Sequence, residues 1–273
     1  YLLIGPPFSK ASAAQCSLQA FLVNRAGDFG FILDIAALSD YFGSVDYTTV
    51  FAQAANFQST TISIFPGSEW SILTVICILL FIGAMGKSAQ VPLHVWLPES
   101  MEGPTPISAL IHAATMVTAG IFMVARMSPL FELSATALST VLIIGATGGL
   151  FLGILAFVES DIKRVIAYST MSQLGYMMAA NGASAFSAGI FHLLTHACFK
   201  ALLFLSAGSV IIAMHHEQNL WKMGNLKKYL PVTYICFLIG ALALSAIPPF
   251  AGYYSKDAII EAVHLAKVPC ATY

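Results

Sequence analysis

Charged residues are scarce in this chain of 273 residues. Asp, Glu, Lys and Arg together make up 9% of it, whereas soluble domains carry about 25%. Hydrophobic residues make up 58%. So few charges could not cover the surface of a water-soluble protein of this size, and we expect the chain to lie in a lipid bilayer. The net charge of -1 also provides no basic surface of the kind that binds nucleic acid.

The chain also lacks cysteine spacings that would hold a metal ion or build a disulfide framework. No pair follows the C-x-x-C pattern, and at least three of the five cysteines lie in apolar runs, where cysteine serves as a small core residue. The five are Cys16, Cys77, Cys198, Cys236 and Cys270. The chain does not begin with the pattern of a secretory signal peptide, which would show a basic segment, a short apolar run and a cleavage site. It begins within apolar sequence, YLLIG, and we expect an internal piece of a longer protein without a metal site.

Long apolar segments fill most of the chain, and about 20 such residues suffice for one membrane crossing. After the tail of one helix at the start, we predict spans at about 18–40, 70–99, 104–126, 136–158, 163–182, 186–214 and 230 to the end. Open sheets are excluded in these spans because lipid cannot satisfy their edge hydrogen bonds. The predicted fold is all-α, a polytopic transmembrane helix bundle of about seven to eight spans.

The basic residues predict the orientation, because Lys and Arg concentrate on the cytoplasmic or matrix side. Alternating spans place on one side Lys10, Arg25, Lys163, Arg164, Lys222, Lys227 and Lys228, and on the other side Arg126 and Lys267. The first side is therefore predicted to be inside. The loop HHEQNLWKMGNLKK belongs there, and we interpret its histidines as solvated rather than metal-binding, since adjacent residues do not share a helix face.

An internal repeat links two parts of the chain at a spacing of 157 residues. Both copies continue into proline, which removes a helical hydrogen bond and opens the backbone: Pro92 in one, Pro248 and Pro249 in the other. The recurring residues are Ile82, Gly83, Ala84, Ser88, Ala89 and Pro92, which return as Ile239, Gly240, Ala241, Ser245, Ala246 and Pro249. Paired discontinuous helices indicate a transport site near the bilayer midplane. We predict two related helix bundles and leave open whether they are inverted.

Two lysines flank the predicted breaks. Lys87 follows sixteen uncharged residues, and a lysine at the centre of a span costs about 2.5–3.5 kcal/mol on the insertion scale. A functional role is favoured over snorkelling to the interface. Lys256 follows the second break beside Asp257, where snorkelling or a local ion pair is a stronger alternative.

Three basic residues form a row in the apolar run FHLLTHACFKALLFL. His192, His196 and Lys200 are spaced i, i+4, i+8, which places them on one face over about 12 Å of helix axis. Histidine changes protonation near neutral pH, so the row could pass protons through intervening water. The alternative is packing by interhelical hydrogen bonds, which we would prefer for a single histidine but not for three basic residues on one face.

Further polar residues have weaker signals. His112 lies in an apolar run and taken alone would be a packing histidine, whereas beside Lys87 it is a plausible relay. Asp161 precedes a predicted helix start, where capping is the favoured role. Arg25 and Asp28 are spaced i, i+3 and are predicted to pair. The glycines of GATGG at 145–149 fall within a predicted span, so they are not a dinucleotide loop.

Four stretches carry a family resemblance: GKSAQVPLHVWLPESMEGPTPISALIHAATMVTAG, DIKRVIAYSTMSQLGYM, FHLLTHACFKALLFLSAGSVI and GYYSKD. They resemble the antiporter-like subunits of proton-pumping NADH:quinone oxidoreductase (respiratory complex I), and among these the NuoL type, known in mitochondria as NADH dehydrogenase subunit 5. The resemblance extends over essentially the whole chain. It implies two inverted bundles, each with a broken helix: residues 1–127 as the latter part of the first and 128–273 as most of the second.

The resemblance implies roles for individual residues. Protons would move along a central axis made of Lys87, His112, His192, His196, Lys200 and Lys256. Asp28 and Asp161 would support these lysines, and Asp257 would neighbour the last of them. The partner glutamate of Lys87 is expected just upstream of Tyr1.

The resemblance also implies partners and cofactors. Other membrane-arm subunits of complex I would contact this chain, and other subunits would carry FMN, iron-sulfur clusters, NADH and quinone, with no cofactor in this chain. The location would be a bacterial cytoplasmic membrane or the mitochondrial inner membrane.

Two alternatives remain at this stage. One is a subunit of a multisubunit Na+/H+ antiporter, although many such relatives carry lysine where this chain has Thr118, and another paralogue of the complex has glutamate in place of Lys256. The other is a purely structural spacer of the membrane arm.

Overall fold

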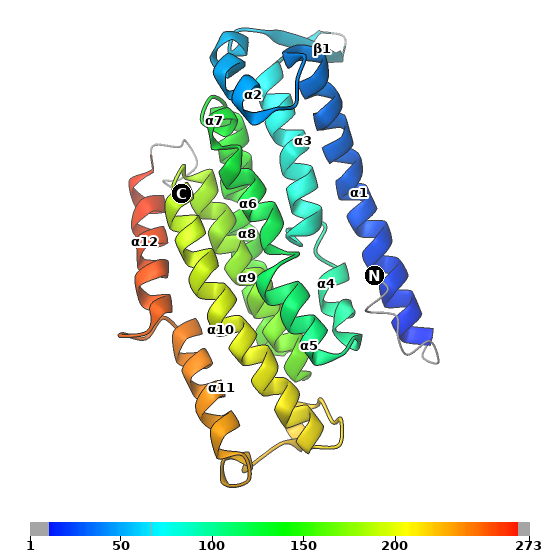
Figure 1. Cartoon of the computed structure of the whole chain (residues 1–273), viewed down its shortest axis with the longest axis vertical. Coiled ribbons are helices and arrows are strands. Elements are labelled where there is room, and N and C mark those ends of the chain that lie inside the picture. The colour runs from blue at the N-terminus through cyan, green and yellow to red at the C-terminus, as the bar shows by residue number, and fades with distance from the viewer. Residues whose placement is uncertain (1–10, 66, 267–273) are drawn as a thin grey trace.

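A computed structural model gives the structure of the chain and describes residues 11–65 and 67–266 (Figure 1). The helices, in chain order, are α1 (Ala11–Phe42), α2 (Tyr47–Gln53), α3 (Ile72–Lys87), α4 (Trp96–Glu99), α5 (Thr105–Ser108), α6 (Thr118–Arg126), α7 (Ser128–Phe131), α8 (Ala135–Val158), α9 (Ile162–Gly182), α10 (Phe186–Ala213), α11 (Pro231–Leu244) and α12 (Ala251–Leu265). Shorter elements are η1 (Ala54–Phe57), β1 (Thr61–Phe65), β2 (Ser68–Ser71), η2 (Ser100–Glu102), the π-helical turn η3 (Ala109–Ala114), η4 (Leu220–Lys222) and η5 (Leu226–Lys228). The long helices lie side by side as a bundle (Figure 1).

The predicted helical class is confirmed, with one element that was not predicted. Strands β1 and β2 form an antiparallel hairpin in the connection after α1, where Ile62 pairs with Trp70 and Thr61 with Ser71. The predicted span at 70 therefore begins only at Ile72. Helix α1 in turn begins before residue 18, since no proline or glycine interrupts it between Ala11 and Arg25, and it ends before Gly43, whose φ of 65° suits glycine after a helix.

Two of the described helices, α8 and α10, are long and apolar enough to cross a membrane by themselves. Helices α3 and α11 are apolar but stop after 16 and 14 residues, because each is interrupted. Helix α1 carries Arg25, Asp28 and Asp34 within its length. The number of spans therefore stays a prediction.

Close packing between helices depends on glycine. A Cβ atom placed on Gly175 of α9 would lie 2.6 Å from the backbone nitrogen of Gly149 on α8. A Cβ atom on Gly27 of α1 would lie 3.0 Å from the Cα atom of Gly86 on α3. Small residues allow helix backbones to approach in this way in membrane bundles. The GATGG segment is part of α8, as predicted.

Both predicted helix breaks are confirmed. Helix α3 ends at Lys87 and α11 ends at Leu244, which are 157 positions apart. Matching features follow at the same spacing: the C-caps Ser88 and Ser245, positive φ angles of 48° at Ala89 and 58° at Ala246, and cis peptide bonds before Pro92 and Pro249. In Figure 1, α3 runs away from the end of the bundle that holds the hairpin, whereas α11 runs toward that end.

A third interruption was not predicted. The segment 104–126, expected as one helix, is divided into α5, the π-helical turn η3 and α6. The division falls at residues 115–117, where the backbone of Thr115 leaves the helical region with φ −123° and ψ −68°. Pro104 and Pro106 lie at the other end of the segment, so they did not signal this position.

The ends of the bundle agree with the predicted sidedness. The hairpin, α2 and α7 lie at one end, and the loop that leads into α11 lies at the other, with Lys222, Lys227 and Lys228 (Figure 1). Arg25 is an exception, because it lies within α1 rather than in a loop and so does not report orientation. Lys10 and Lys267 lie outside the described residues.

Candidate functional site

The basic row of α10 shares the buried face of its helix. His192, His196 and Lys200 are each 0% exposed, whereas Leu194 and Leu205 on the other side are 64% and 52% exposed. The rings of His192 and His196 lie 6.3 Å apart between centroids. The predicted spacing argument is confirmed: one face of a single helix carries three basic groups into the protein interior.

Neutral polar groups from two other helices bind His192. Its Nδ1 lies 2.8 Å from Ser255 Oγ of α12, and its Nε2 lies 3.2 Å from Gln173 Oε1 of α9. Thr195 Oγ1 lies 3.1 Å from the same serine oxygen. Both ring nitrogens of His192 therefore have a hydrogen-bond partner. These hydrogen bonds connect α9, α10 and α12 around the imidazole ring.

Lys200 reaches α9 rather than a carboxylate. Its Nζ donates to Ser169 Oγ at 2.6 Å and to the carbonyl of Ile166 at 3.3 Å. Within the described part of the chain no acidic side chain pairs with it. A buried ammonium without a counter-ion is costly in a membrane protein.

Lys256 lies at the second helix break. Its Nζ donates at 2.6 Å to the carbonyl of Leu244, the last residue of α11, and lies 5.8 Å from the ring centroid of Tyr176. A cation at a helix C-terminus interacts favourably with the helix dipole. The side chain of Asp257 is exposed and makes no ion pair with Lys256 in the described residues, so the local pair considered from the sequence is absent there.

Lys87 at the first break has a carboxylate partner. Its Nζ lies 3.1 Å from Asp28 Oδ1 of α1. Arg25 also approaches Asp28, at 3.4 Å, as their spacing predicts. The pair is partly exposed, with 37% of Lys87 and 25% of the Asp28 side chain accessible.

The remaining predicted residues lie on other elements than the basic row of α10 and the two helix breaks. The backbone of His112 belongs to the π-helical turn η3, which packs against α10, and its side chain lies outside the described part of the structure. Asp161 caps α9 by accepting a hydrogen bond from the Lys163 amide at 2.9 Å, as predicted. Lys163 is 4% exposed, and its Nζ donates to the carbonyls of Met101 and Gly103 at 3.4 and 3.1 Å.

Several polar residues of the interior were missed from the sequence. Gln173, Ser169 and Ser255 form hydrogen bonds with the basic row of α10. Each is a polar residue in a helical segment, and this could have drawn attention to it in the sequence. Asp34 of α1 is 1% exposed, and neither of its carboxyl oxygens has a hydrogen-bond partner in the described residues. A carboxyl group in a predicted span was itself a signal that distinguished Asp34 from its apolar neighbours.

The residues that the structure describes contain no cluster of three or more His, Cys, Asp or Glu side chains able to hold a metal ion. Their four cysteines are free thiols at separate positions: Cys16, Cys77, Cys198 and Cys236. The groups that the site brings together are lysines, histidines and hydroxyl groups.

Comparison with known proteins gives a consistent result. The family described as "NADH:quinone oxidoreductase/Mrp antiporter, TM" matches residues 1–272. NADH-quinone oxidoreductase subunit L of Neisseria meningitidis serogroup B is 63% identical over 270 residues, which are 98% of this chain and 40% of that protein. NADH-ubiquinone oxidoreductase chain 5 of Marchantia polymorpha is 54% identical over 96% of this chain and 39% of its own length. The chain thus spans about 40% of the length of these relatives.

A solved structure has the same architecture. The Mrp complex from Dietzia sp. DQ12-45-1b contains a chain that superposes with a TM-score of 0.82 at 28% sequence identity. The superposition covers 98% of this chain and 29% of that one. The arrangement of helices described above therefore recurs in a membrane complex of known structure.

Proposed function

The chain belongs to the NADH:quinone oxidoreductase/Mrp antiporter transmembrane family, and from this premise we propose that it forms the proton-translocating core of a membrane-arm subunit of NADH:quinone oxidoreductase. The family resemblance predicted from its motifs is thereby confirmed. The observation that supports the proposal most is the buried row His192, His196 and Lys200, each 0% exposed in an apolar helix. A membrane protein keeps such costly groups where protons or ions pass.

Protons move along this row by changes of protonation. His192 exchanges a proton with the Ser255 hydroxyl through Nδ1, and Ser255 lies on α12, the helix that also carries Lys256 at the second break. Lys200 donates a hydrogen bond to Ser169, whose hydroxyl can receive that proton as it passes its own proton to a water. His112 links the row to Lys87, whose charge depends on Asp28. The apolar helices contribute by excluding water, which makes each charge state sensitive to its neighbours.

The two helix breaks support an arrangement of two inverted bundles. We place residues 1–127 in the latter part of the first and residues 128–273 in most of the second. The matching features at a spacing of 157 residues and the opposite directions of α3 and α11 in Figure 1 favour this division. Both breaks would open backbone groups toward the proton path near the midplane.

Redox chemistry belongs to other subunits in this proposal. NADH, FMN, iron-sulfur clusters and quinone are bound there, and electron transfer changes the charge states along the row from a distance. Other subunits of the membrane arm pack against this chain. The membrane is a bacterial cytoplasmic membrane or the mitochondrial inner membrane, with the loop before α11 on the inside.

A second candidate is ion exchange in a multisubunit Na+/H+ antiporter, which the similarity to the Mrp complex favours. The higher identity of 63% to an NADH-quinone oxidoreductase subunit supports the main proposal instead. Dependence of transport on sodium would distinguish the two.

Replacement of Lys200 by alanine in the full-length subunit tests the proposal. Proton pumping by membrane vesicles and coupled NADH oxidation should both fall at least about a hundredfold, the lower range for loss of a proton-transfer group, while the complex assembles. The matched control is Cys198→Ala, an exposed position on the same helix, which should leave both rates unchanged. Undiminished pumping by the Lys200→Ala complex would refute the relay and favour the spacer. Pumping that requires sodium would favour the antiporter.

A further inference from the structure

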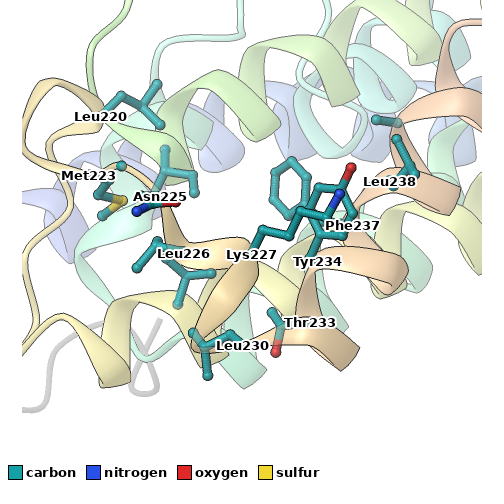
Figure 2. Close-up of a pocket in the computed structure, with 14 residues that line it drawn as sticks. Leu220, Met223, Asn225, Leu226, Lys227, Leu230, Thr233, Tyr234, Phe237 and Leu238 are labelled. Atoms are coloured by element: carbon teal, nitrogen blue, oxygen red, sulfur yellow. The ribbon is translucent and has the colours of Figure 1, made fainter.

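A groove lies where the loop 219–230 folds back on α10 and α11. Its volume is about 490 Å³, within the range of roughly 300–1,000 Å³ that small-molecule sites occupy. Figure 2 shows Leu226, Leu230, Phe237 and Leu238 around it, with the Lys227 side chain extended along one side. The remaining lining residues are Ile162, Val210, Leu220, Met223, Gly224, Asn225, Thr233, Tyr234 and Ala241. The walls are apolar and one edge is basic.

The basic edge has uncommitted charge. Lys227 and Lys228 are exposed and form no ion pair among the described residues, although the Lys227 Nζ lies 4.9 Å from the ring centroid of Tyr234. Lys222 in the same loop differs, because its Nζ lies 2.8 Å from Glu217 Oε2. The hydrogen bond from Lys222 and that from the Asn219 amide lower the pKa of Glu217. Two of the three loop lysines are therefore available to an anion.

Exposed aromatic residues mark the same loop as a membrane interface. Trp221 is 87% exposed and Tyr229 is 79% exposed, and both belong to the segment that forms the groove. Val232 at the start of α11 is 72% exposed. Trp and Tyr gather at the level of lipid headgroups, where their rings are half in apolar and half in polar surroundings. The groove thus runs from the headgroup level along α11 into the apolar region.

We propose that this groove binds an anionic phospholipid, with an acyl chain along Leu230, Phe237 and Leu238 and the phosphate group at Lys227 and Lys228. Apolar walls below a basic edge, on the side where Lys and Arg concentrate, match the two halves of such a lipid. A zwitterionic lipid would satisfy the walls, but its own cationic headgroup already offsets its phosphate charge, so it would gain less from the two lysines than an anionic lipid. The site is separate from the buried row of α10 and does not depend on proton transfer there.

Photocrosslinking in the assembled complex tests this binding site. The complex with the full-length subunit is placed in phosphatidylcholine nanodiscs that contain phosphatidylglycerol with a photoreactive group in its acyl chain. Peptides of α11 and of the loop 219–230 should be labelled, and unlabelled phosphatidylglycerol should compete far better than phosphatidylcholine. Labelling should fall roughly fivefold for each lysine lost in Lys227→Gln and Lys228→Gln.

Two further variants separate the contributions of the groove. Lys222→Gln removes the same charge from a lysine that Glu217 already binds, so labelling should not change. Ala241→Phe fills the groove and should abolish labelling while the loop keeps its charge. The proposal is wrong if phosphatidylcholine competes equally, if the lysine variants label like the parent, or if the photoreactive lipid labels other subunits but not α11 and the loop 219–230. Native electrophoresis verifies that each variant complex is assembled.

Discussion

The two broken helices have the same backbone geometry but hold their lysines in different ways. In α3–α4 the lysine is the last residue before the break, and it pairs with Asp28 at 3.1 Å. In α11–α12 the lysine follows the break, and its Nζ donates to the carbonyl of Leu244 at 2.6 Å. The position that matches Lys87 in the second copy is Leu244. Both copies of the repeat thus have the break in the helix, but the lysine precedes the break in the first copy and follows it in the second.

The difference gives the two breaks different electrostatics. The first break holds a lysine beside a carboxylate, so a neutral substitution of either residue changes the net charge there. Lys256 donates to a backbone carbonyl and has no acidic partner among the described residues. The first break therefore pairs its lysine with a carboxylate, whereas the second surrounds its lysine with neutral groups. The following changes test this distinction.

The largest effect is expected at Lys256. Substitution by methionine removes the proton carrier, and substitution by arginine retains a charge that cannot be released near neutral pH. Both Lys256→Met and Lys256→Arg should reduce proton pumping in membrane vesicles at least about a hundredfold. Normal pumping with arginine would show that charge alone suffices at this break.

Gly252 should have the next largest effect, because the second break is packed more tightly than the first. A Cβ atom on Gly252 would lie 1.8 Å from the carbonyl oxygen of Ala243, whereas the matching position of the first break holds Val95, which is 45% exposed. Gly252→Ala should destabilise the subunit by about 1–3 kcal/mol. Val95→Ala is the control and should change stability by no more than about 0.5 kcal/mol. Thermal unfolding of the purified complex measures both.

The pair at the first break should show moderate coupling. Asp28→Asn leaves Lys87 without its counter-ion, and Lys87→Met in the same chain should relieve much of that loss. Because both side chains are partly exposed, the coupling energy should be about 1–2 kcal/mol, between the values for surface and buried pairs. A double-mutant cycle on thermal stability measures it. Strict additivity would mean that the two residues act independently.

The smallest effect concerns the two serines that end α3 and α11. Ser88 is 0% exposed and donates to the carbonyl of Val117 at 2.7 Å, whereas Ser245 is exposed and donates within its own helix to Ala241. Ser88→Ala should cost about 1–2 kcal/mol because it leaves a buried carbonyl with one partner fewer. Ser245→Ala should cost less than about 0.5 kcal/mol. Equal effects would show that the serines serve the break itself rather than the contact with Val117.

Much of this fold was predictable because its signals are local. Apolar runs marked the helices, and prolines marked both breaks within a few residues of their observed positions. The spacing of His192, His196 and Lys200 was sufficient to place them on one face. The interruption at 115–117 was missed because no proline lies where the backbone leaves the helix. The hairpin at 61–71 was missed because its segment was interpreted only as a loop, although the alternating TISIF and the Pro-Gly at 66–67 are strand and turn signals in the sequence.

The sequence by itself determined which segments are helical, where two of them break and which face of α10 is basic, because these properties depend on residues within a few turns of one another. The tertiary structure alone decided the partners of each titratable group: Asp28 for Lys87, Gln173 and Ser255 for His192, and the Leu244 carbonyl for Lys256. Residues as far apart as Asp28 and Lys87 meet only when α1 packs against α3 through Gly27 and Gly86. The cost of a charge in a membrane depends on such contacts, and no local pattern in the sequence contains them.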